Sequence, residues 1–390
     1  MKVFYIQPTF DTSRPRNIRT ANIVNILKEI HDIEVFTFST KAIPREIEGV
    51  KITRMPYHGV SKWFINRHQY GYRHSAIMQP FVKAVSYIIR QFLWPDVWIF
   101  EKHRIQKFVS HNASYPDIIV CSMMPFSMGK TGLELKEKHY PNAKLVFDIG
   151  DPLSNNSAHE LSNSAKYCSY EKRLLGGADG IVVTNEATKA YYVDSLKLDA
   201  EKIFVIPQGV DTALFKPTEK KVSIKSGIKL VYAGSFYPKL RDPEPLLESV
   251  AKTEGVSIDI YGGVSSIQGE GVLYAEKVSQ QELVEKISKC DWLVFIDNAY
   301  GMQTSGKIFE LLSLKMPILF IYRDTNSKVY QDAKKYKNVY FVMNEHAAVA
   351  EALKEMKNIE YGQEDYNYDV AHFSWKERAN RFREVFENVS

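Results

Sequence analysis

The feature that most constrains this chain is the alternation, in both of its halves, of short apolar runs with amphipathic segments. Short apolar runs bounded by turn residues are typical of strands that are buried on both faces of a sheet. Apolar residues at helical spacing between those runs indicate helices that cover the sheet. The alternation therefore predicts the α/β class, with parallel strands and a layer of helices on each face.

Each half of the chain is predicted to contain its own set of these elements. In the first half we expect strands at 3–6, 34–38, 118–121, 145–147 and 181–184, with helices at 20–30 and 170–175. In the second half we expect strands at 229–233, 257–261, 292–296, 318–321 and 339–342, with helices at 245–252 and 280–289. The sequence has no internal repeat, so the halves are expected to share an architecture without being copies of each other.

The length of 390 residues also indicates two domains, because single hydrophobic cores stop growing at about 250–300 residues. Between the halves lies the polar, proline-bearing stretch Ile206–Gly227, whose centre is rich in lysine. Such a composition is typical of a linker. We therefore expect a first domain at 1–205, a linker at 206–227, a second domain at 228–372 and a closing segment at 373–390.

Composition places the chain among ordinary intracellular globular proteins. Hydrophobic residues make up 45% of the chain and charged residues 25%, values at which both domains can bury a core. The cysteines Cys121, Cys168 and Cys290 lie far apart, which fits a reducing compartment and no metal site. The start of the chain lacks the features of a signal peptide, and its longest apolar runs are far shorter than the ~20 residues that cross a bilayer. We expect a cytoplasmic protein.

The net charge of +5 is unevenly distributed. The stretch 51–110 holds ten basic residues against two acidic ones, a net charge of +8, and aromatic residues are interleaved with them from Ser61 to Phe108. Two interpretations stay open. Such helices can lie on the anionic inner face of the cell membrane as a peripheral contact, or the aromatic residues pack in the core while the charges reach solvent. No nucleic-acid-binding motif is present, so we expect no nucleic acid partner.

The loop and helix after the predicted strand 292–296 are the best candidates for a binding site. In parallel α/β sheets, ligands bind at the carboxyl ends of the strands. Here Ser305 and Gly306 precede a helix that is expected to start at Gly306 or Lys307, where backbone N–H groups and a lysine suit a phosphate. Glu310, one turn later, can accept hydrogen bonds from two adjacent ribose hydroxyls. The alternative is a serine that caps the helix and an ordinary surface glutamate.

Six segments, in order along the chain, resemble the glycosyltransferases of the GT-B fold. They are most similar to the large retaining family that builds bacterial surface polysaccharides, a family 4-like group. The segments are Ala178–Thr184, Val205–Asp211 with Phe215 after it, Leu230–Ser235, Ile258–Gly263, Ser305–Leu312 with Lys315–Leu319 after it, and Phe373–Trp375. The resemblance is strong from Ala178 onward and weak from Val50 to Ile118.

This resemblance implies two Rossmann-like domains that face each other across a cleft, with a C-terminal helix that crosses back to the first domain. It implies the transfer of a sugar from a nucleotide-sugar donor, such as a UDP- or GDP-sugar, to a glycan or lipid-linked acceptor, with retention of the anomeric configuration. No cofactor is implied. Because no Asp-x-Asp pair follows a strand, we expect metal independence, with basic groups stabilising the diphosphate.

The resemblance also assigns residues of the donor site. Glu310 is implied to hold the ribose, and Gly262 and Gly263 to let the backbone approach the nucleotide, with a plain turn after the strand as the alternative. The diphosphate is expected to lie among Gly234, Ser235, Lys239 or Arg241, Thr304, Ser305, Gly306 and Lys307. The chain departs from the family at two of its positions: Met302 stands where a second glutamate is common, and Ser235 where an arginine is common.

In the first domain, Asp151 of the Asp-Pro pair after the strand 145–147 is the candidate for the catalytic or sugar-positioning carboxylate. A turn aspartate before proline is the alternative. The loop after the first strand carries Asp11, Arg16 and Arg19, and the two arginines share a face if the helix has begun. They are candidates for binding an anionic acceptor or the leaving phosphates, or they form a solvated helix start.

Three rival functions follow from the same pattern. A nucleotide-sugar epimerase of this architecture would use a similar nucleotide site without an acceptor. An inactive GT-B scaffold protein is the second rival, suggested by Met302. A dinucleotide-dependent dehydrogenase is disfavoured, because no Gly-x-Gly-x-x-Gly follows a predicted strand.

Overall fold

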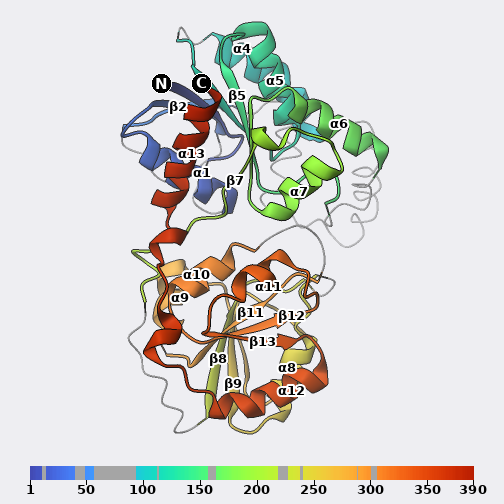
Figure 1. Ribbon diagram of the computed structural model, residues 1–390, viewed down its shortest axis with the longest axis vertical. Coiled ribbons are helices and arrows are strands. Elements are labelled where there is room, and N and C mark those ends of the chain that lie inside the picture. The colour runs from blue at the N-terminus through green and yellow to red at the C-terminus, as the bar shows by residue number, and fades with distance from the viewer. Residues whose placement is uncertain are drawn as a thin grey trace. The chain divides into compact units, whose positions relative to one another are not determined.

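The computed structural model describes residues 1–10, 15–39, 49–56, 94–111, 114–156, 164–217, 227–237, 240–287, 289–299 and 305–390. These residues divide into two units, drawn in Figure 1: unit 1, Met1–Pro207 with Arg378–Ser390, and unit 2, Gln208–Glu377. The chain passes from unit 1 to unit 2 after Pro207 and returns within α13 (Trp375–Val389).

Unit 1 is built on a parallel sheet with the strand order β3-β2-β1-β4-β5-β6-β7. The strands are β1 (Lys2–Ile6), β2 (Asp32–Ser39), β3 (Lys51–Pro56), β4 (Ile118–Ser122), β5 (Lys144–Ile149), β6 (Gly180–Val183) and β7 (Ile203–Val205). The described helices are α1 (Pro15–Leu27), α4 (Lys102–Ser110), α5 (Ser127–His139), α6 (Ala165–Gly176) and α7 (Glu186–Asp194), with short 3₁₀ turns η1 (Val97–Glu101) and η2 (Ala200–Lys202).

The central strands of unit 1 are buried on both faces, as a parallel sheet covered by helices requires. Every residue of β4 is buried, and its neighbour β5 is buried from Leu145 onward. The helices begin where the sequence provides caps: the Asn185 side chain accepts a hydrogen bond from the Thr188 backbone at 2.8 Å and so starts α7. In this unit α13 lies beside α1, with the Phe382 ring 5.4 Å from the Arg19 guanidinium carbon (Figure 1).

Unit 2 repeats the architecture with a parallel sheet in the order β10-β9-β8-β11-β12-β13. Its strands are β8 (Ile228–Ala233), β9 (Val256–Tyr261), β10 (Val272–Ala275), β11 (Trp292–Ile296), β12 (Ile318–Tyr322) and β13 (Val339–Met343). The described helices are α8 (Glu244–Lys252), α9 (Gln280–Ile287), α10 (Lys307–Ser313), α11 (Lys328–Ala333) and α12 (His346–Glu355), followed by the 3₁₀ turns η3 (Met356–Asn358), η4 (Gln363–Tyr366) and η5 (Ala371–Phe373).

Alternate residues of the central strands of unit 2 enter different hydrophobic clusters. Leu293 and Phe295 of β11 belong to one cluster, whereas Trp292, Val294 and Ile296 belong to another. Side chains of a strand point alternately to opposite faces. Both faces of this sheet are therefore covered, which confirms the α/β class expected from the sequence.

Each strand predicted from an apolar run is present, with ends that differ from the prediction by at most two residues. The strands β3, β7 and β10 were not predicted. β10 has a mixed burial pattern typical of a sheet edge, and β7 has three residues, so neither gives a clear apolar run. α1 begins at Pro15, before its apolar pattern, because proline suits the first position of a helix. No helix in the described ranges is long and apolar enough to span a membrane.

Candidate functional site

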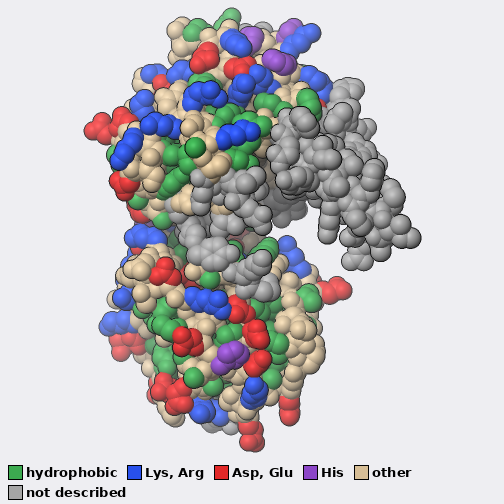
Figure 2. Space-filling model, turned by 90° about the vertical axis from the view of Figure 1, so that its right-hand side faces the viewer, with side chains coloured by type: hydrophobic (Ala, Val, Ile, Leu, Met, Phe, Trp, Pro, Cys, Tyr) green, Lys and Arg blue, Asp and Glu red, His purple; other side chains and the backbone are tan. Residues whose placement is uncertain are grey.

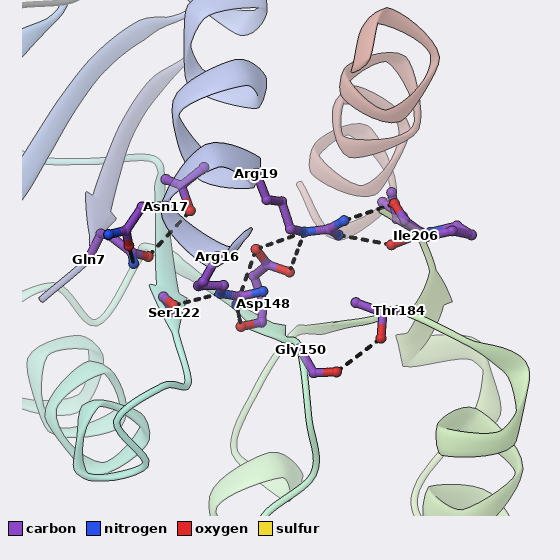
Figure 3. A network of polar contacts seen from close by, with 11 residues as sticks. Gln7, Arg16, Asn17, Arg19, Ser122, Asp148, Gly150, Thr184 and Ile206 are labelled. Atoms are coloured by element: carbon purple, nitrogen blue, oxygen red, sulfur yellow. Dashed lines mark hydrogen bonds and ion pairs between the residues drawn. The ribbon is translucent and has the colours of Figure 1, made fainter. Parts of the chain in front are cut away.

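In unit 1 the strand order reverses between β1 and β4, and polar side chains meet at the carboxyl ends of these strands (Figure 3). Arg16, the second residue of α1, donates from Nε to the Ser122 hydroxyl at the end of β4, at 2.9 Å. The reversal point of an open parallel sheet is where such folds bind ligands. The bond between Arg16 and Ser122 therefore bridges the expected ligand edge of unit 1.

A buried carboxylate, Asp148 of β5, holds both arginines of α1. Its Oδ2 lies 3.2 Å from Arg16 Nη2, and its Oδ1 lies 3.4 Å from Arg19 Nε. Arg16 Nη2 also donates to the Asp148 backbone carbonyl. The Asp148 side chain is 3% exposed and that of Arg19 1%, so this ion network is shielded from solvent and has a fixed geometry (Figure 3).

The guanidinium of Arg19 makes its contacts with other residues of unit 1. Its Nη1 donates to the Pro207 carbonyl and its Nη2 to the Ile206 carbonyl, both at 2.9 Å. Together with Asp148 and the ring of Phe382, these contacts surround the guanidinium. The sequence suggested that Arg19 shares a ligand-binding face with Arg16. The structure instead places it where the chain leaves unit 1, so we assign it to the fold.

Arg16 keeps one nitrogen available. Among the described residues Nη1 is buried and has no hydrogen-bond partner, and a Cβ placed on Gly150 would lie 3.7 Å from it. Burial lowers the pKa of Arg16, and the carboxylates of Asp148 and Asp151 oppose that change. A guanidinium with a free N–H beside the loop after β5 can receive an anionic or hydroxyl group.

The start of α1 is fixed by a separate set of buried polar contacts. Gln7 Nε2 donates to Asn17 Oδ1 at 3.0 Å, and the Thr9 hydroxyl donates to the same oxygen at 3.1 Å. The Thr20 hydroxyl donates to Gln7 Oε1 at 3.3 Å. The loop after β1 is thereby tied to the first turns of the helix that carries Arg16.

Asp151 follows β5 by two residues and is partly buried. The preceding Gly150 carbonyl accepts a 2.9 Å hydrogen bond from the Thr184 hydroxyl, just after β6 (Figure 3). Asp151 is close enough to influence the pKa values of Arg16 and Tyr192 through its charge. The carboxylate proposed from the sequence therefore lies at the carboxyl edge of the sheet, in the neighbourhood of Arg16.

In unit 2 the strand order reverses between β8 and β11, and an arginine again bridges the two strand ends. Arg241, from the loop after β8, donates from Nε to Asn298 Oδ1 at 2.7 Å, and Asn298 lies two residues beyond β11. Ala299 N donates to the Leu240 carbonyl at 2.7 Å, which ties the same two loops through the backbone. Arg241 is thus held at the ligand edge of this sheet.

Asp297, the residue directly after β11, supports this junction from within. It is buried, and it accepts hydrogen bonds from the Ser327 hydroxyl and the Asn298 backbone. Burial raises the pKa of Asp297, whereas these hydrogen bonds and the charge of Arg241 act in the opposite direction. The network fixes the loop that begins with Asn298.

The helix α10 begins at Lys307, with Gly306 rather than Ser305 in the capping position. A Cβ on Gly306 would lie 2.8 Å from the Gln208 side chain, so a glycine is needed there for the helix start to pack against Gln208. Because β11, α10 and β12 form a crossover between parallel strands, α10 starts at the carboxyl edge of the sheet.

Lys307 and Glu310 form an ion pair in the first turn of α10. The Lys307 Nζ lies 2.7 Å from Glu310 Oε2, and the side chains are 26% and 20% exposed. Gln280 Nε2 at the start of α9 donates to Glu310 Oε1 at 3.4 Å. Because both side chains keep part of their surface exposed, a ligand can replace their mutual contacts with its own.

The glycines of the proposed donor site have conformational reasons of their own. Gly262 has a φ of +84°, which favours glycine in the turn after β9. A Cβ on Gly263 would lie 2.6 Å from the Phe236 ring, so its missing side chain makes room for Phe236. Gly234 follows β8 with a φ of +153° and donates to the Tyr261 carbonyl at 3.0 Å, and Ser235 after it is exposed. The turn explanation of Gly262 and Gly263 thus has direct support.

Several sequence-based predictions lie outside the described residues. These are Asp11, Lys239, Met302, Thr304 and the part of the basic aromatic stretch at 57–93. Sequence reasoning in turn assigned no role to Ser122, Asp148, Gln280 and Asn298. The signal for Asp148 and Asn298 was their position at the carboxyl end of a strand, but position alone does not say which polar residue holds which arginine. Among the described residues, no group of three or more His, Cys, Asp or Glu side chains is arranged to hold a metal ion.

Comparison with known proteins agrees with this architecture. Residues 20–214, half of the chain, match the model of a family described as Glycosyltransferase Family 4. No curated protein matches the sequence. Among solved structures, sucrose-phosphate synthase (tll1590) from Thermosynechococcus elongatus is similar with a TM-score of 0.69 and 14% identity, over 99% of this chain and 98% of the other.

Two further solved structures are similar over the whole chain. Alr3699/HepE of Anabaena, in complex with UDP and glucose, has a TM-score of 0.67 and 10% identity, over 99% of both chains. The lipopolysaccharide outer core galactosyltransferase WaaB, in its apo form, has a TM-score of 0.63 and 13% identity, again over 99% of both. At these identities the similarity shows the fold, and the GT-B fold expected from the sequence is confirmed.

Proposed function

This chain belongs to Glycosyltransferase Family 4, and we propose that it moves a sugar from a nucleoside diphosphate sugar to a glycan or lipid-linked acceptor. The observation that carries the proposal is the solvent-accessible pair of Lys307 and Glu310, which lies on α10 at the carboxyl edge of the unit 2 sheet. A cation and a carboxylate one turn apart match the diphosphate and the ribose of such a donor.

Unit 2 is proposed to bind the donor. Glu310 accepts hydrogen bonds from the ribose hydroxyls, and Lys307 exchanges part of its contact with Glu310 for the diphosphate. Arg241, whose orientation is fixed by Asn298 at 2.7 Å, adds a second cation at the reversal point of the sheet. The backbone at Gly234, Ser235, Ser305 and Gly306 completes the proposed phosphate site. HepE was solved with UDP, and we propose a UDP- or GDP-sugar as the donor here.

Unit 1 is proposed to act on the transferred sugar and the acceptor. The bond between the anomeric carbon and the diphosphate oxygen breaks, and its electron pair leaves with the nucleoside diphosphate. The acceptor oxygen forms the new bond on the face of that carbon from which the diphosphate leaves, and its proton passes to the leaving diphosphate. Attack on this face retains the anomeric configuration. The Asp151 carboxylate positions the sugar and stabilises the positive charge that develops on it. The free N–H of Arg16 holds a polar group of the acceptor.

The same proposal includes metal independence, because Lys307 and Arg241 provide positive charge for the leaving diphosphate from the chain itself. Turnover in excess EDTA checks this point. Full activity that appears only with added Mg²⁺ or Mn²⁺ would contradict it.

A role in bacterial surface polysaccharide synthesis, in lipopolysaccharide or capsule, is proposed from the sequence resemblance and from the likeness to WaaB. We place the reaction in the cytoplasm, at the inner face of the cell membrane. On the face drawn in Figure 2, Lys, Arg and His side chains gather at the end of unit 1 where α4 lies. His103, Lys107, Phe108 and His111 are exposed there, a mixture suited to anionic lipid headgroups.

The membrane contact has its own test. The protein is expected to sediment with vesicles that contain phosphatidylglycerol at low salt, and to be released as salt screens the charges. A protein that ignores anionic vesicles even at low salt would remove this part of the proposal without affecting the reaction.

The reaction itself is tested with a panel of UDP- and GDP-sugars. Each is incubated first with water and then with a bacterial extract of lipid-linked oligosaccharides as acceptor, and release of the nucleoside diphosphate is measured. We expect one donor to release nucleotide, faster with the acceptor extract, and the product to retain the anomeric configuration by NMR. An isomerised donor without nucleotide release would indicate an epimerase, and no turnover of any donor would indicate an inactive scaffold.

A further inference from the structure

The loop 150–156, which follows β5 and carries Asp151, is held by side chains along its length. The Thr184 hydroxyl donates to the Gly150 carbonyl at 2.9 Å, and Asn156 Nδ2 donates to the Pro152 carbonyl at 2.9 Å. Asn155 has a φ of +54°, a conformation that asparagine tolerates better than most residues. The loop thus has a defined conformation on both sides of Asp151.

The strongest hold on this loop is the carboxylate of Glu171 in α6. Oε1 accepts hydrogen bonds from the Leu153 backbone N–H at 2.8 Å and from the Tyr192 hydroxyl at 2.7 Å. Oε2 accepts from the Ser154 backbone N–H at 2.8 Å and from the Ser154 hydroxyl. The residue is 1% exposed. A buried carboxylate with four donors has the full set of partners that keeps a charge stable away from water.

A second layer supports these contacts from α7. The Tyr191 hydroxyl lies 2.8 Å from the Ser154 hydroxyl, while Tyr192 reaches Glu171 directly. Glu171 of α6 therefore holds Leu153 and Ser154, and α7 supports this contact through Tyr191 at Ser154 and Tyr192 at Glu171. Burying a charged group is costly, and packed apolar residues often serve stability as well or better. A carboxylate at this place fixes the orientation of the backbone N–H groups of Leu153 and Ser154, whereas apolar side chains cannot orient an N–H group.

We propose that Glu171 is a positioning residue: by fixing the N–H groups of Leu153 and Ser154, it sets the place of the Asp151 carboxylate in the reaction. The inference rests on the proposed function, because it gives Asp151 a role at the transferred sugar. Glu171 itself does not touch substrate. A displacement of about 1 Å at a reacting group is enough to slow a reaction about 100-fold.

The test uses Glu171→Gln in the full-length protein. The amide keeps the size of the side chain but replaces one acceptor oxygen with an NH₂ group. Hydroxyl partners can rotate to accept from that group, whereas a backbone N–H cannot, so Leu153 or Ser154 loses its acceptor in either amide orientation. The matched control is Glu34→Gln on β2, another buried carboxylate of unit 1, which pairs with Lys51 at 2.9 Å.

The first measurement is hydrogen–deuterium exchange, which needs no substrate. We expect the amides of 150–156 to exchange about tenfold faster in Glu171→Gln than in the wild type, and to be unchanged in Glu34→Gln. Unchanged protection of these amides in Glu171→Gln would overturn the inference whatever the activity of the protein.

The second measurement is turnover of the active donor, in a cycle with Asp151→Asn. Glu171→Gln is expected to lower kcat about 10- to 100-fold and to leave the Kd of the nucleoside diphosphate unchanged. In the Asp151→Asn background it should lower kcat by less than about twofold, because residues that act through one another are not additive. If the two single losses of kcat multiply in the double variant, Glu171 acts independently of Asp151 and its role is purely structural. A wild type without turnover would overturn the proposed function and the catalytic part of this inference, while the exchange experiment would still decide whether Glu171 holds the loop.

Discussion

The two units place an arginine at the same point of the same kind of sheet, yet they use it differently. In unit 1, Arg16 spans from α1 to Ser122 at the end of β4, and in unit 2, Arg241 spans to Asn298 just after β11. Each bond joins the segments at the carboxyl ends of the two strands between which the strand order reverses. The shared architecture therefore explains where the arginines lie, but it does not explain what they do.

The charged groups near these two arginines differ in how deeply they are buried. In unit 1 the arginines share the carboxylate of Asp148, which is 3% exposed, and Arg19 has its donors filled by the chain itself. In unit 2 the charged pair of Lys307 and Glu310 is 26% and 20% exposed. A buried network fixes the fold, whereas a partly exposed pair can exchange partners with a ligand. Position at a strand end selects candidates for a site. Filled donors then mark Arg19 as a residue that supports the fold, whereas Arg16 keeps one donor without a partner among the described residues.

The largest effect expected from this contrast follows the change Asp148→Asn. It removes the counter-charge of two arginines in a buried setting, where breaking an ion network costs about 3–5 kcal/mol of unfolding free energy. The matched control is Asp242→Asn in unit 2, whose partner is the more exposed Arg323. A pair of that kind contributes about 0–1 kcal/mol. Urea unfolding measures both, and equal losses in the two variants would remove the distinction between the units.

The next effect tests the ligand side of the comparison. Glu310→Ala should weaken binding of the nucleoside diphosphate by about 1–3 kcal/mol, the range for lost hydrogen bonds to a charged group, while the unfolding midpoint stays unchanged. Glu285→Ala, an exposed glutamate on α9, is the control and should leave affinity unaltered. Titration calorimetry gives the affinity. An unchanged affinity for Glu310→Ala, or a loss of stability in place of affinity, would contradict the role assigned to this side chain.

The smallest effect concerns how the unfolding free energy changes at acid pH, and we expect it at Glu134 in unit 1. Burial acts to raise the pKa of Glu134 on α5, but hydrogen bonds from Lys102, Gln106 and Lys138 outweigh it and lower the pKa to about 2, from an ordinary value of 4.5. The pKa of Glu134 is depressed only in the folded state. The contacts of the Glu134 carboxylate therefore stabilise the protein fully above about pH 4.5, and this stability is lost as the pH falls toward 2.

The corresponding variant is Glu134→Gln, compared with Glu285→Gln in unit 2. The wild type should be more stable than Glu134→Gln at pH 7, and the difference should shrink steadily between about pH 4.5 and pH 2. Urea unfolding at several pH values measures it. A difference in unfolding free energy that stays constant with pH would show that Lys102, Gln106 and Lys138 do not depress the pKa of Glu134 as described.

Most of the fold could be predicted from the sequence, because buried parallel strands are strongly apolar. β11, for example, reads Trp-Leu-Val-Phe-Ile and was predicted with its observed bounds. The strands β3, β7 and β10 were missed, since a sheet edge or a three-residue strand leaves a mixed or short pattern. The beginning of α1 was also missed, because its first five residues include Arg16, Asn17 and Arg19, whose placement depends on tertiary partners.

The site could be predicted only where one segment contains its partners. Lys307 and Glu310 lie one turn apart, so their proximity follows from helical spacing alone. The distinction between Arg16 and Arg19 was not accessible, because it depends on Asp148, 132 and 129 positions away in the sequence. The hold of Glu171 on the Asp151 loop has the same origin, since backbone N–H groups leave no trace in the sequence.

The central claim is that unit 2 binds the nucleoside diphosphate part of a sugar donor. It is tested most directly by titration calorimetry of the wild type with UDP, GDP, ADP and CDP, each with Mg²⁺ and with EDTA. We expect one of them to bind with micromolar affinity that is the same with and without the metal ion. No binding of any nucleoside diphosphate would contradict the claim and remove the roles proposed for Lys307, Glu310 and Arg241.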